Sequence, residues 1–132
     1  MIVFAGEFPS NVTPWQRAAE AFGARVVMLD GRRWLEDEEG VLAAVEQALA
    51  SGRVRVLAVS AVQFQTGFRV PLRALADRCH AHGALLFVDA VQAFGMVPID
   101  VVAEGVDFAA AGAHKWMMGC EGAAILYATQ RA

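Results

Sequence analysis

Two charged residues in apolar surroundings are the first candidates for chemistry. Asp89 follows the apolar run 84–88, and Lys115 lies in the stretch 108–120, which is otherwise without Lys, Arg, Asp or Glu. Burial disfavours an ammonium group and lowers its pKa, and a neutral amine can attack a carbonyl carbon to form a Schiff base. Lys115 is therefore a candidate nucleophile, although a solvated loop lysine is an equally simple interpretation.

A carboxylate and an amine together are the pair that pyridoxal phosphate (PLP) requires. A lysine bonds the aldehyde carbon of PLP, and a carboxylate keeps its ring nitrogen protonated so that the ring can accept electrons. Asp89 is the candidate carboxylate, and its alternative role is to cap a turn after a strand. Gln92 and His114 lie close to the pair in sequence, and each could equally be an ordinary turn or packing residue.

The elements that position these residues alternate between strands and helices, which predicts an α/β fold. After the apolar run 1–5, we expect strands at 25–29, 54–60, 84–88, 106–111 and 122–127. The run 84–88 is continuous, as in a parallel strand that is covered on both faces. Ligands bind beyond the carboxyl ends of such strands, where Asp89 and the pair His114–Lys115 lie.

Helices are predicted from capping residues and apolar spacing. The first begins at Thr13-Pro14 and stops at Gly23, the second covers 41–49 after the acidic residues 37–39, and the third is opened by Pro71. The expected buried stripe of the first is Trp15, Ala18, Ala19 and Phe22, and that of the third is Leu72, Leu75, Ala76 and Cys79.

Composition excludes several classes of protein. The chain has 132 residues, 57% of them hydrophobic, and a net charge of −3, which argues for a folded domain and against nucleic-acid binding. No apolar run reaches the length of a membrane span and the N-terminus lacks the features of a signal peptide, so we expect a cytoplasmic protein. Cys79 and Cys120 are expected to be reduced and buried. No glycine-rich nucleotide-binding motif occurs.

Several segments together resemble one family. They are 87–95 (FVDAVQAFG), 98–101 (PIDV), 105–108 (GVDF), 112–122 (GAHKWMMGCEG) and 126–127 (LY), with a further resemblance in the loop 60–69. In order and spacing these segments resemble class V aminotransferases, a group of fold-type I PLP enzymes that includes cysteine desulfurases and selenocysteine lyases. The resemblance implies a three-layer αβα fold with a mostly parallel sheet.

The resemblance also implies roles for single residues. Lys115 would form the Schiff base with PLP and later move protons at the substrate Cα, and Asp89 would pair with the ring nitrogen. Gln92 would hydrogen-bond the ring hydroxyl oxygen, and His114 would lie beside the phosphate or orient the lysine. Gln63, or in another register Gln65, would face the ring.

Two positions depart from the family pattern. Gly112 stands where a Ser or Thr commonly holds the phosphate, which weakens the expected grip on it. Cys120 stands where many relatives have Pro, and we interpret it as structural because the desulfurase nucleophile belongs to a later part of the family's chain.

The chain resembles only the central part of the family's large domain, so we expect residues 1–132 to form one partial PLP-binding domain. The ring-stacking residue, the start of the phosphate-binding helix, the small domain and the substrate-binding arginine are expected to lie outside it. One hypothesis is a PLP-dependent enzyme that acts on an amino acid by transamination, β-elimination or desulfuration, as a homo-oligomer or with a complementary chain. The alternative is a non-catalytic remnant or split-enzyme subunit with exposed apolar edges.

Overall fold

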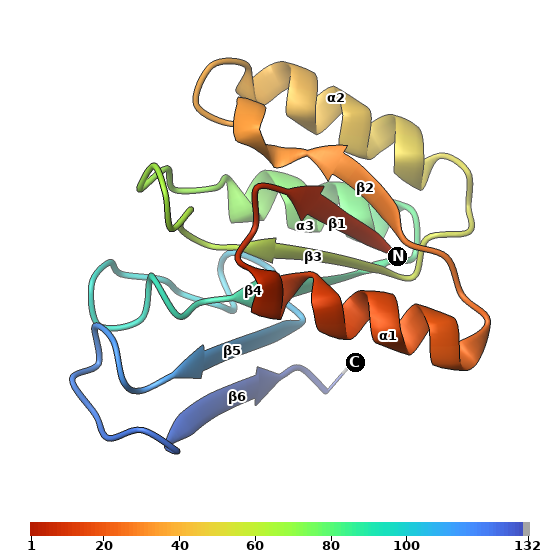
Figure 1. Cartoon of the computed structure of the whole chain (residues 1–132). Helices are drawn as coiled ribbons and strands as arrows, with labels where there is room; N and C mark the ends of the chain where they lie inside the picture. The colour runs from red at the N-terminus through yellow and green to blue at the C-terminus, as the bar shows by residue number, and fades with distance from the viewer. Residues whose placement is uncertain (131–132) are drawn as a thin grey trace.

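Six strands form a single sheet in the computed structural model, which describes residues 1–130. The strands are β1 (Ile2–Ala5), β2 (Val27–Asp30), β3 (Val56–Ser60), β4 (Leu85–Asp89), β5 (Phe108–Gly112) and β6 (Ala124–Ala128). Their order is β2-β1-β3-β4-β5-β6; the neighbours from β2 to β5 are parallel and β6 is antiparallel to β5. Figure 1 shows β6 pointing against the other strands at one edge of the sheet.

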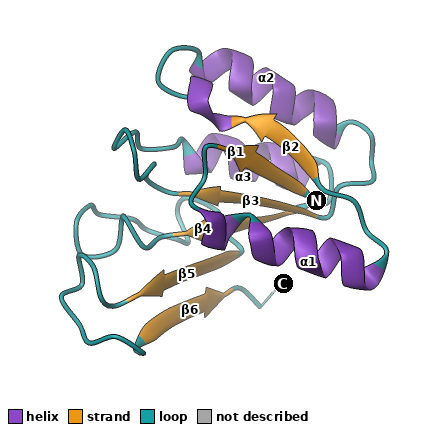
Figure 2. Ribbon diagram, in the orientation of Figure 1, coloured by secondary structure: helices purple, strands orange, loops and turns teal. Residues whose placement is uncertain are grey.

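Helices cover the sheet on both faces, which confirms the three-layer arrangement. They are α1 (Thr13–Phe22), α2 (Glu38–Leu49) and α3 (Leu72–Ala81), with short 3-10 turns η1 (Pro9–Asn11) and η2 (Gly31–Arg33). α1 lies on one face, and α2 and α3 lie side by side on the other (Figure 2). The alternation of strands and helices stops after β4, because the chain reaches β5 through a series of turns rather than a helix.

The helix boundaries follow the capping signals. α1 begins at Thr13, which is its first residue and not its cap, since Val12 is the N-cap residue and no side chain caps the helix; Gly23 ends α1 in the left-handed conformation with a φ of 65°. α2 begins three residues before the predicted apolar stripe because the Asp37 carboxylate accepts a hydrogen bond of 2.9 Å from the Gly40 N–H. Pro71 directly precedes α3, as predicted.

Two predictions about burial are wrong. In the expected stripe of α1 only Ala19 is buried, and Phe22 is 85% exposed because it is the last residue of the helix, one turn beyond the part that packs on the sheet. Cys120 is exposed because it lies in the turns between β5 and β6, whereas Cys79 is buried on α3. Burial raises the pKa of the Cys79 thiol to about 12, so this cysteine stays protonated.

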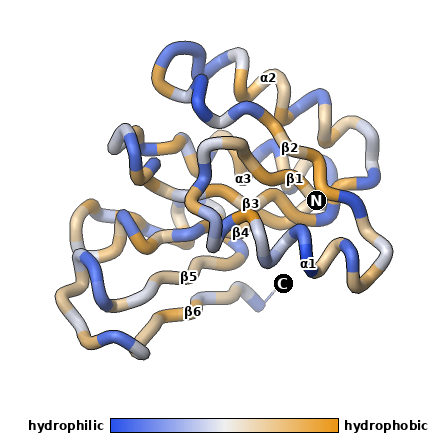
Figure 3. The backbone as a smooth tube through the Cα atoms, in the orientation of Figure 1, coloured by the Kyte–Doolittle hydropathy of each residue, from blue (hydrophilic) through white to orange (hydrophobic). Residues whose placement is uncertain are grey.

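The core lies between the sheet and the α2–α3 layer. Leu86 and Val88 on β4 are at most 1% exposed, and so are Leu75 and Cys79 on α3. Figure 3 shows the apolar residues concentrated on β1, β3 and β4. By contrast, Leu126 on β6 is 74% exposed. Within residues 1–130, no helix has both the length and the apolar character needed to cross a membrane.

Candidate functional site

The carboxyl ends of the parallel strands bring the predicted residues to one edge of the sheet. Ser60 at the end of β3 pairs in register with Asp89 at the end of β4, and Asp89 pairs with Ala110 on β5. Lys115 follows three residues after the end of β5. Ser60 and Lys115, which are separated by 55 positions in the sequence, therefore both lie at this edge, on either side of the end of β4.

Asp89 has an environment that favours a cationic partner. Its carboxylate is half-buried and accepts a hydrogen bond of 2.9 Å from the Val91 N–H. Burial raises the pKa of Asp89, while the Val91 hydrogen bond and the positive charge of Lys115 act in the opposite direction. A partly desolvated carboxylate gains from a protonated ring nitrogen placed against it, so the residue fits the role predicted for it.

Lys115 lies next to an aromatic ring. Its Nζ is 5.5 Å from the centroid of the Phe8 ring, and Phe8 packs edge to face on Phe64 at 5.4 Å between centroids. An aromatic face beside the amine offers a flat apolar surface on which a heteroaromatic ring can stack. The sequence analysis expected the stacking residue outside the chain and did not single out Phe8. The available signal was its position shortly after β1, at the same edge of the sheet as Asp89.

Gln92 is oriented by Trp116. The indole Nε1–H of Trp116 donates to the side-chain oxygen of Gln92 at 3.0 Å. Because an indole can only donate, the amide oxygen must face Trp116, and the amide N–H groups are left to donate elsewhere. This orientation suits the predicted hydrogen bond from Gln92 to a hydroxyl oxygen.

Close contact at Gly95 brings together the loop after β4 and the loop after β5. A Cβ added at Gly95, whose φ is 87°, would lie 2.5 Å from the Trp116 carbonyl oxygen. Only glycine combines this backbone conformation with room for the neighbouring backbone. The loop that carries Asp89 and Gln92 is thereby held against the loop that carries Lys115.

His114 occupies the space beside Gly112. The side chain is exposed, and its ring atoms Cε1 and Nδ1 lie 2.8 Å from where a Cβ at Gly112 would be. A Ser or Thr at position 112 would require the imidazole to move. The departure from the family pattern at Gly112 and the position of His114 are therefore linked.

Asp89 and His114 border an open pocket of about 410 Å³ on the α1 face of the sheet, whereas Lys115, Gln92 and Phe8 do not line it. Its lining includes Asp89, Val91, Gly112, His114 and, on β6, Leu126. Gln63 does not line it, because the buried Gln63 side chain donates to the Glu7 carboxylate at 3.3 Å. Gln65 is exposed and borders a separate small hollow beside Trp34.

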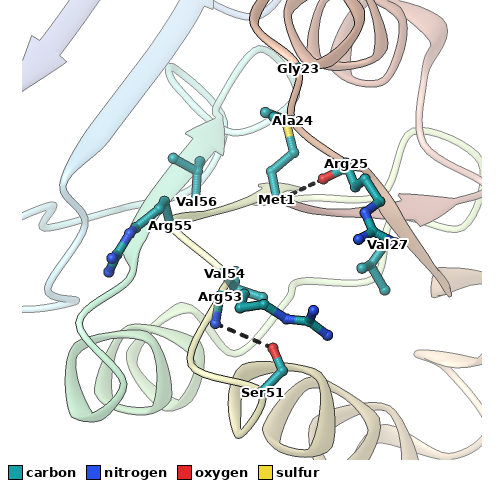
Figure 4. A pocket seen from close by; sticks show the side chains of 10 residues that line it. All are labelled: Met1, Gly23, Ala24, Arg25, Val27, Ser51, Arg53, Val54, Arg55 and Val56. Carbon is teal, nitrogen blue, oxygen red and sulfur yellow. Dashed lines mark hydrogen bonds between the residues drawn. The ribbon is translucent and has the colours of Figure 1, made fainter.

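A second pocket, of about 330 Å³, lies at the opposite edge of the sheet and is shown in Figure 4. Its charged side chains are Arg25, Arg53 and Arg55. Arg55 extends to one side of the pocket and Arg53 to the other, so their guanidinium groups do not converge on one point. No group of His, Cys, Asp and Glu residues in the described part of the chain is arranged to hold a metal ion. The carboxyl edge of the sheet is therefore the candidate site.

Comparison with known proteins finds cysteine desulfurases and aminotransferases among the relatives. The family model "Aminotransferase class-V" matches residues 1–132. A cysteine desulfurase of Klebsiella pneumoniae is 37% identical over 132 residues, which cover 97% of this chain and 30% of that protein. The solved structure of the cysteine desulfurase CsdA from Escherichia coli superposes with a TM-score of 0.84 at 28% identity, over 98% of this chain and 31% of that one.

A mutant of C-DES, solved with glycine covalently linked to its PLP cofactor, has the same fold. Its TM-score is 0.89 at 24% identity, and the match covers 98% of this chain and 34% of that one. The chain thus spans about 30% of the length of the Klebsiella pneumoniae cysteine desulfurase.

Proposed function

The chain belongs to the class-V aminotransferase family, and we propose that it forms the PLP-binding part of an enzyme that acts on an amino acid through a Schiff base at Lys115. The observation that carries the proposal is the convergence of Asp89, Gln92 and Lys115 on one edge of the sheet, with the Phe8 ring beside the amine. When bound, PLP supplies an electron-accepting ring for carbanion chemistry.

The residues of the site divide the work of holding PLP and moving protons. Asp89 would hold the protonated ring nitrogen, and the amide N–H of Gln92 would donate to the ring hydroxyl oxygen. Phe8 would cover one face of the ring. Lys115 would bond the aldehyde carbon and, once displaced by an amino-acid substrate, would be placed to take the proton from the substrate Cα and return it.

The phosphate end of the site depends on His114. Gly112 has no hydroxyl to offer, and the Ala113 N–H already donates to the Ala123 carbonyl oxygen at 2.9 Å. The His114 imidazole, which fills the space beside Gly112, is the polar side chain in this segment that is left to meet a phosphate. We propose that further phosphate contacts come from outside the 132 residues.

The exposed edge strand β6 supports the proposal that residues 1–132 work as part of a larger assembly. Ile125 and Leu126 on β6 are 48% and 74% exposed, and the site pocket opens beside them. A homo-oligomer or a complementary chain would cover such apolar residues. The same observation favours the second candidate function, in which the chain is a non-catalytic remnant or a split-enzyme subunit without activity of its own.

The test is to titrate the purified chain with PLP and to follow the near-visible absorbance. We expect a Lys115-dependent band that borohydride reduction makes permanent. Lys115 is the only lysine in the chain, so peptide mapping after reduction must find the label at one internal residue. Lys115→Ala has no other side-chain amine and serves as the control for labelling of the N-terminus.

Two outcomes decide between the candidate functions. Labelling of Lys115 supports the enzyme and justifies screening amino acids, cysteine first because the Klebsiella pneumoniae relative is a cysteine desulfurase. A folded chain that gives the same weak spectrum as Lys115→Ala would contradict the role of Lys115 and favour the remnant.

A further inference from the structure

Glu7 is a buried carboxylate that binds only hydrogen-bond donors. It follows β1, is 8% exposed, and accepts from the Ser60 N–H at 2.9 Å and from the Ser60 hydroxyl. It also accepts from the side-chain amides of Gln63 at 3.3 Å and Asn11 at 3.2 Å. A buried charge is tolerated only where its acceptor sites are filled in this way, because desolvation of an unpaired carboxylate is very unfavourable.

These contacts join two loops that are distant in the sequence. Glu7 lies 53 residues from Ser60 and 56 residues from Gln63, which end or follow β3. Phe8 is the next residue after Glu7, and Phe64 is the next after Gln63. The carboxylate thus joins the two residues that directly precede Phe8 and Phe64, whose rings pack together, with the Phe8 ring beside Lys115.

Packing alone is a weak restraint on these rings. Phe8 is 45% exposed and Phe64 is 40% exposed, so neither ring is enclosed by the core. Backbone restraint is stronger, because the neighbouring Glu7 and Gln63 are both buried and bonded to each other. The position of the Phe8 ring is therefore set mainly by the backbone, which the hydrogen bonds of the neighbouring Glu7 hold in place.

We propose that Glu7 is a positioning residue, which holds Phe8 against Lys115 by tying the loop after β1 to the loop after β3. Its relevance to PLP rests on the proposed function, whereas its effect on the Phe8 ring does not. Gln63 then serves the site as a partner of Glu7 rather than as a group that faces the cofactor ring.

The first test replaces Glu7 by glutamine, Glu7→Gln. The new amide keeps one acceptor oxygen, and its NH2 group replaces the other, so two of the four donors lose their acceptor unless the Ser60 hydroxyl or the Asn11 amide turns to accept; the tie between the loops is weakened while the side-chain volume is kept. By NMR, the Lys115 side-chain protons of the wild-type chain should show an upfield ring-current shift from Phe8 that Glu7→Gln loses. PLP affinity, read from the Lys115-dependent band, should fall about tenfold.

Two further variants separate positioning from general destabilisation. Ser60→Ala removes one donor from Glu7 and should reduce the ring-current shift only partly, which gives a reading even if Glu7→Gln fails to fold. Cys79→Ala makes a small cavity in the core on the opposite face and should leave the shift and the PLP affinity unchanged.

The proposal is overturned if Ser60→Ala and a folded Glu7→Gln both keep the wild-type ring-current shift, as Cys79→Ala does. It is also overturned if the wild-type Lys115 protons show no such shift. If the wild-type chain shows the shift but no Lys115-dependent PLP band, the proposed function fails, and the NMR comparison still decides the role of Glu7.

Discussion

The two faces of the sheet differ in how completely they are covered. Toward α2 and α3, the side chains of Leu86 and Val88 are at most 1% exposed. Toward α1, Phe87 meets the Trp15 ring at 5.0 Å, but the paired positions farther along this face, Ala110 and Leu126, border the open pocket. α1 packs over β4 through Trp15, whereas Leu126 on β6 is 74% exposed.

This difference separates stability from chemistry. The closed face buries apolar area continuously and supplies most of the favourable free energy of folding. The open face carries Asp89 and the pocket beside it, where partial exposure leaves room for a ligand. Substitutions on the two faces should therefore have separable effects on the free energy of unfolding and on PLP binding.

The largest effect on stability is expected from Leu75→Ala on the closed face. Leu75 is fully buried on α3, and its truncation should lower the free energy of unfolding by about 3 kcal/mol. Urea denaturation measures the loss, and a PLP titration well below the unfolding midpoint should give the wild-type affinity. A PLP affinity that fell together with stability would show that the two faces are not independent.

Gly95→Ala should damage both stability and the site. The new Cβ would lie 2.5 Å from the Trp116 carbonyl oxygen at a φ of 87°. Relief of this clash should push the Lys115 loop away from Gln92 and lower the free energy of unfolding by about 2 kcal/mol. The matched control is Gly52→Ala, which has a φ of 66° and no atom within 4 Å of the added Cβ. If both variants bind PLP equally well, the close approach at Gly95 has no part in the site.

Local patterns predicted the alternation of strands and helices, whereas the three-layer arrangement was implied by the family resemblance. Continuous apolar runs such as 84–88 locate the strands, and capping residues such as Asp37 and Gly23 locate the ends of helices, because both depend on neighbouring residues. The direction of β6 and the exposure of Phe22 could not be read in this way. They depend on where each element meets the sheet, which no short window of sequence contains.

Asp89 and Lys115 were singled out in the sequence because charged residues stand out in apolar segments, and their roles in the site remain predictions. Phe8 was missed because its contact with Lys115 joins positions 107 residues apart. Gln63 was assigned to the ring because an amide in that loop matches the family, but its bond to Glu7 is visible only in three dimensions.

Asp89→Asn should weaken PLP binding at least tenfold while it stabilises the chain without PLP by about 0.5 kcal/mol at neutral pH. Because the pKa of Asp89 is raised, the folded chain keeps the carboxyl proton of Asp89 above pH 3.8, where the unfolded chain has begun to release it. Stability from this group is therefore complete below pH 3.8 and is lost as the pH rises through the folded pKa.

Urea denaturation across this pH range measures the effect of Asp89. Asp89→Asn should remove that part of the pH dependence, whereas Asp77→Asn, at an exposed carboxylate paired with Arg73, should leave it. If Asp89→Asn lowered stability at neutral pH, the open face would be contributing to folding in the same way as the closed face.

The smallest effect is expected from Trp116→Phe, which keeps an aromatic ring but removes the hydrogen bond to Gln92. The Gln92 amide would then be able to rotate, and the loss of one oriented donor should weaken PLP binding about threefold, near 0.6 kcal/mol. Trp116 is 46% exposed, so the free energy of unfolding should change by less than about 0.5 kcal/mol. Trp15→Phe is the control, because Trp15 on α1 packs on Phe87 and its indole N–H donates to no residue in the described part of the chain. Trp15→Phe should lower stability without changing PLP affinity. If instead Trp15→Phe weakened PLP binding and Trp116→Phe did not, the rings, and not the indole N–H of Trp116, would determine how Gln92 meets its ligand.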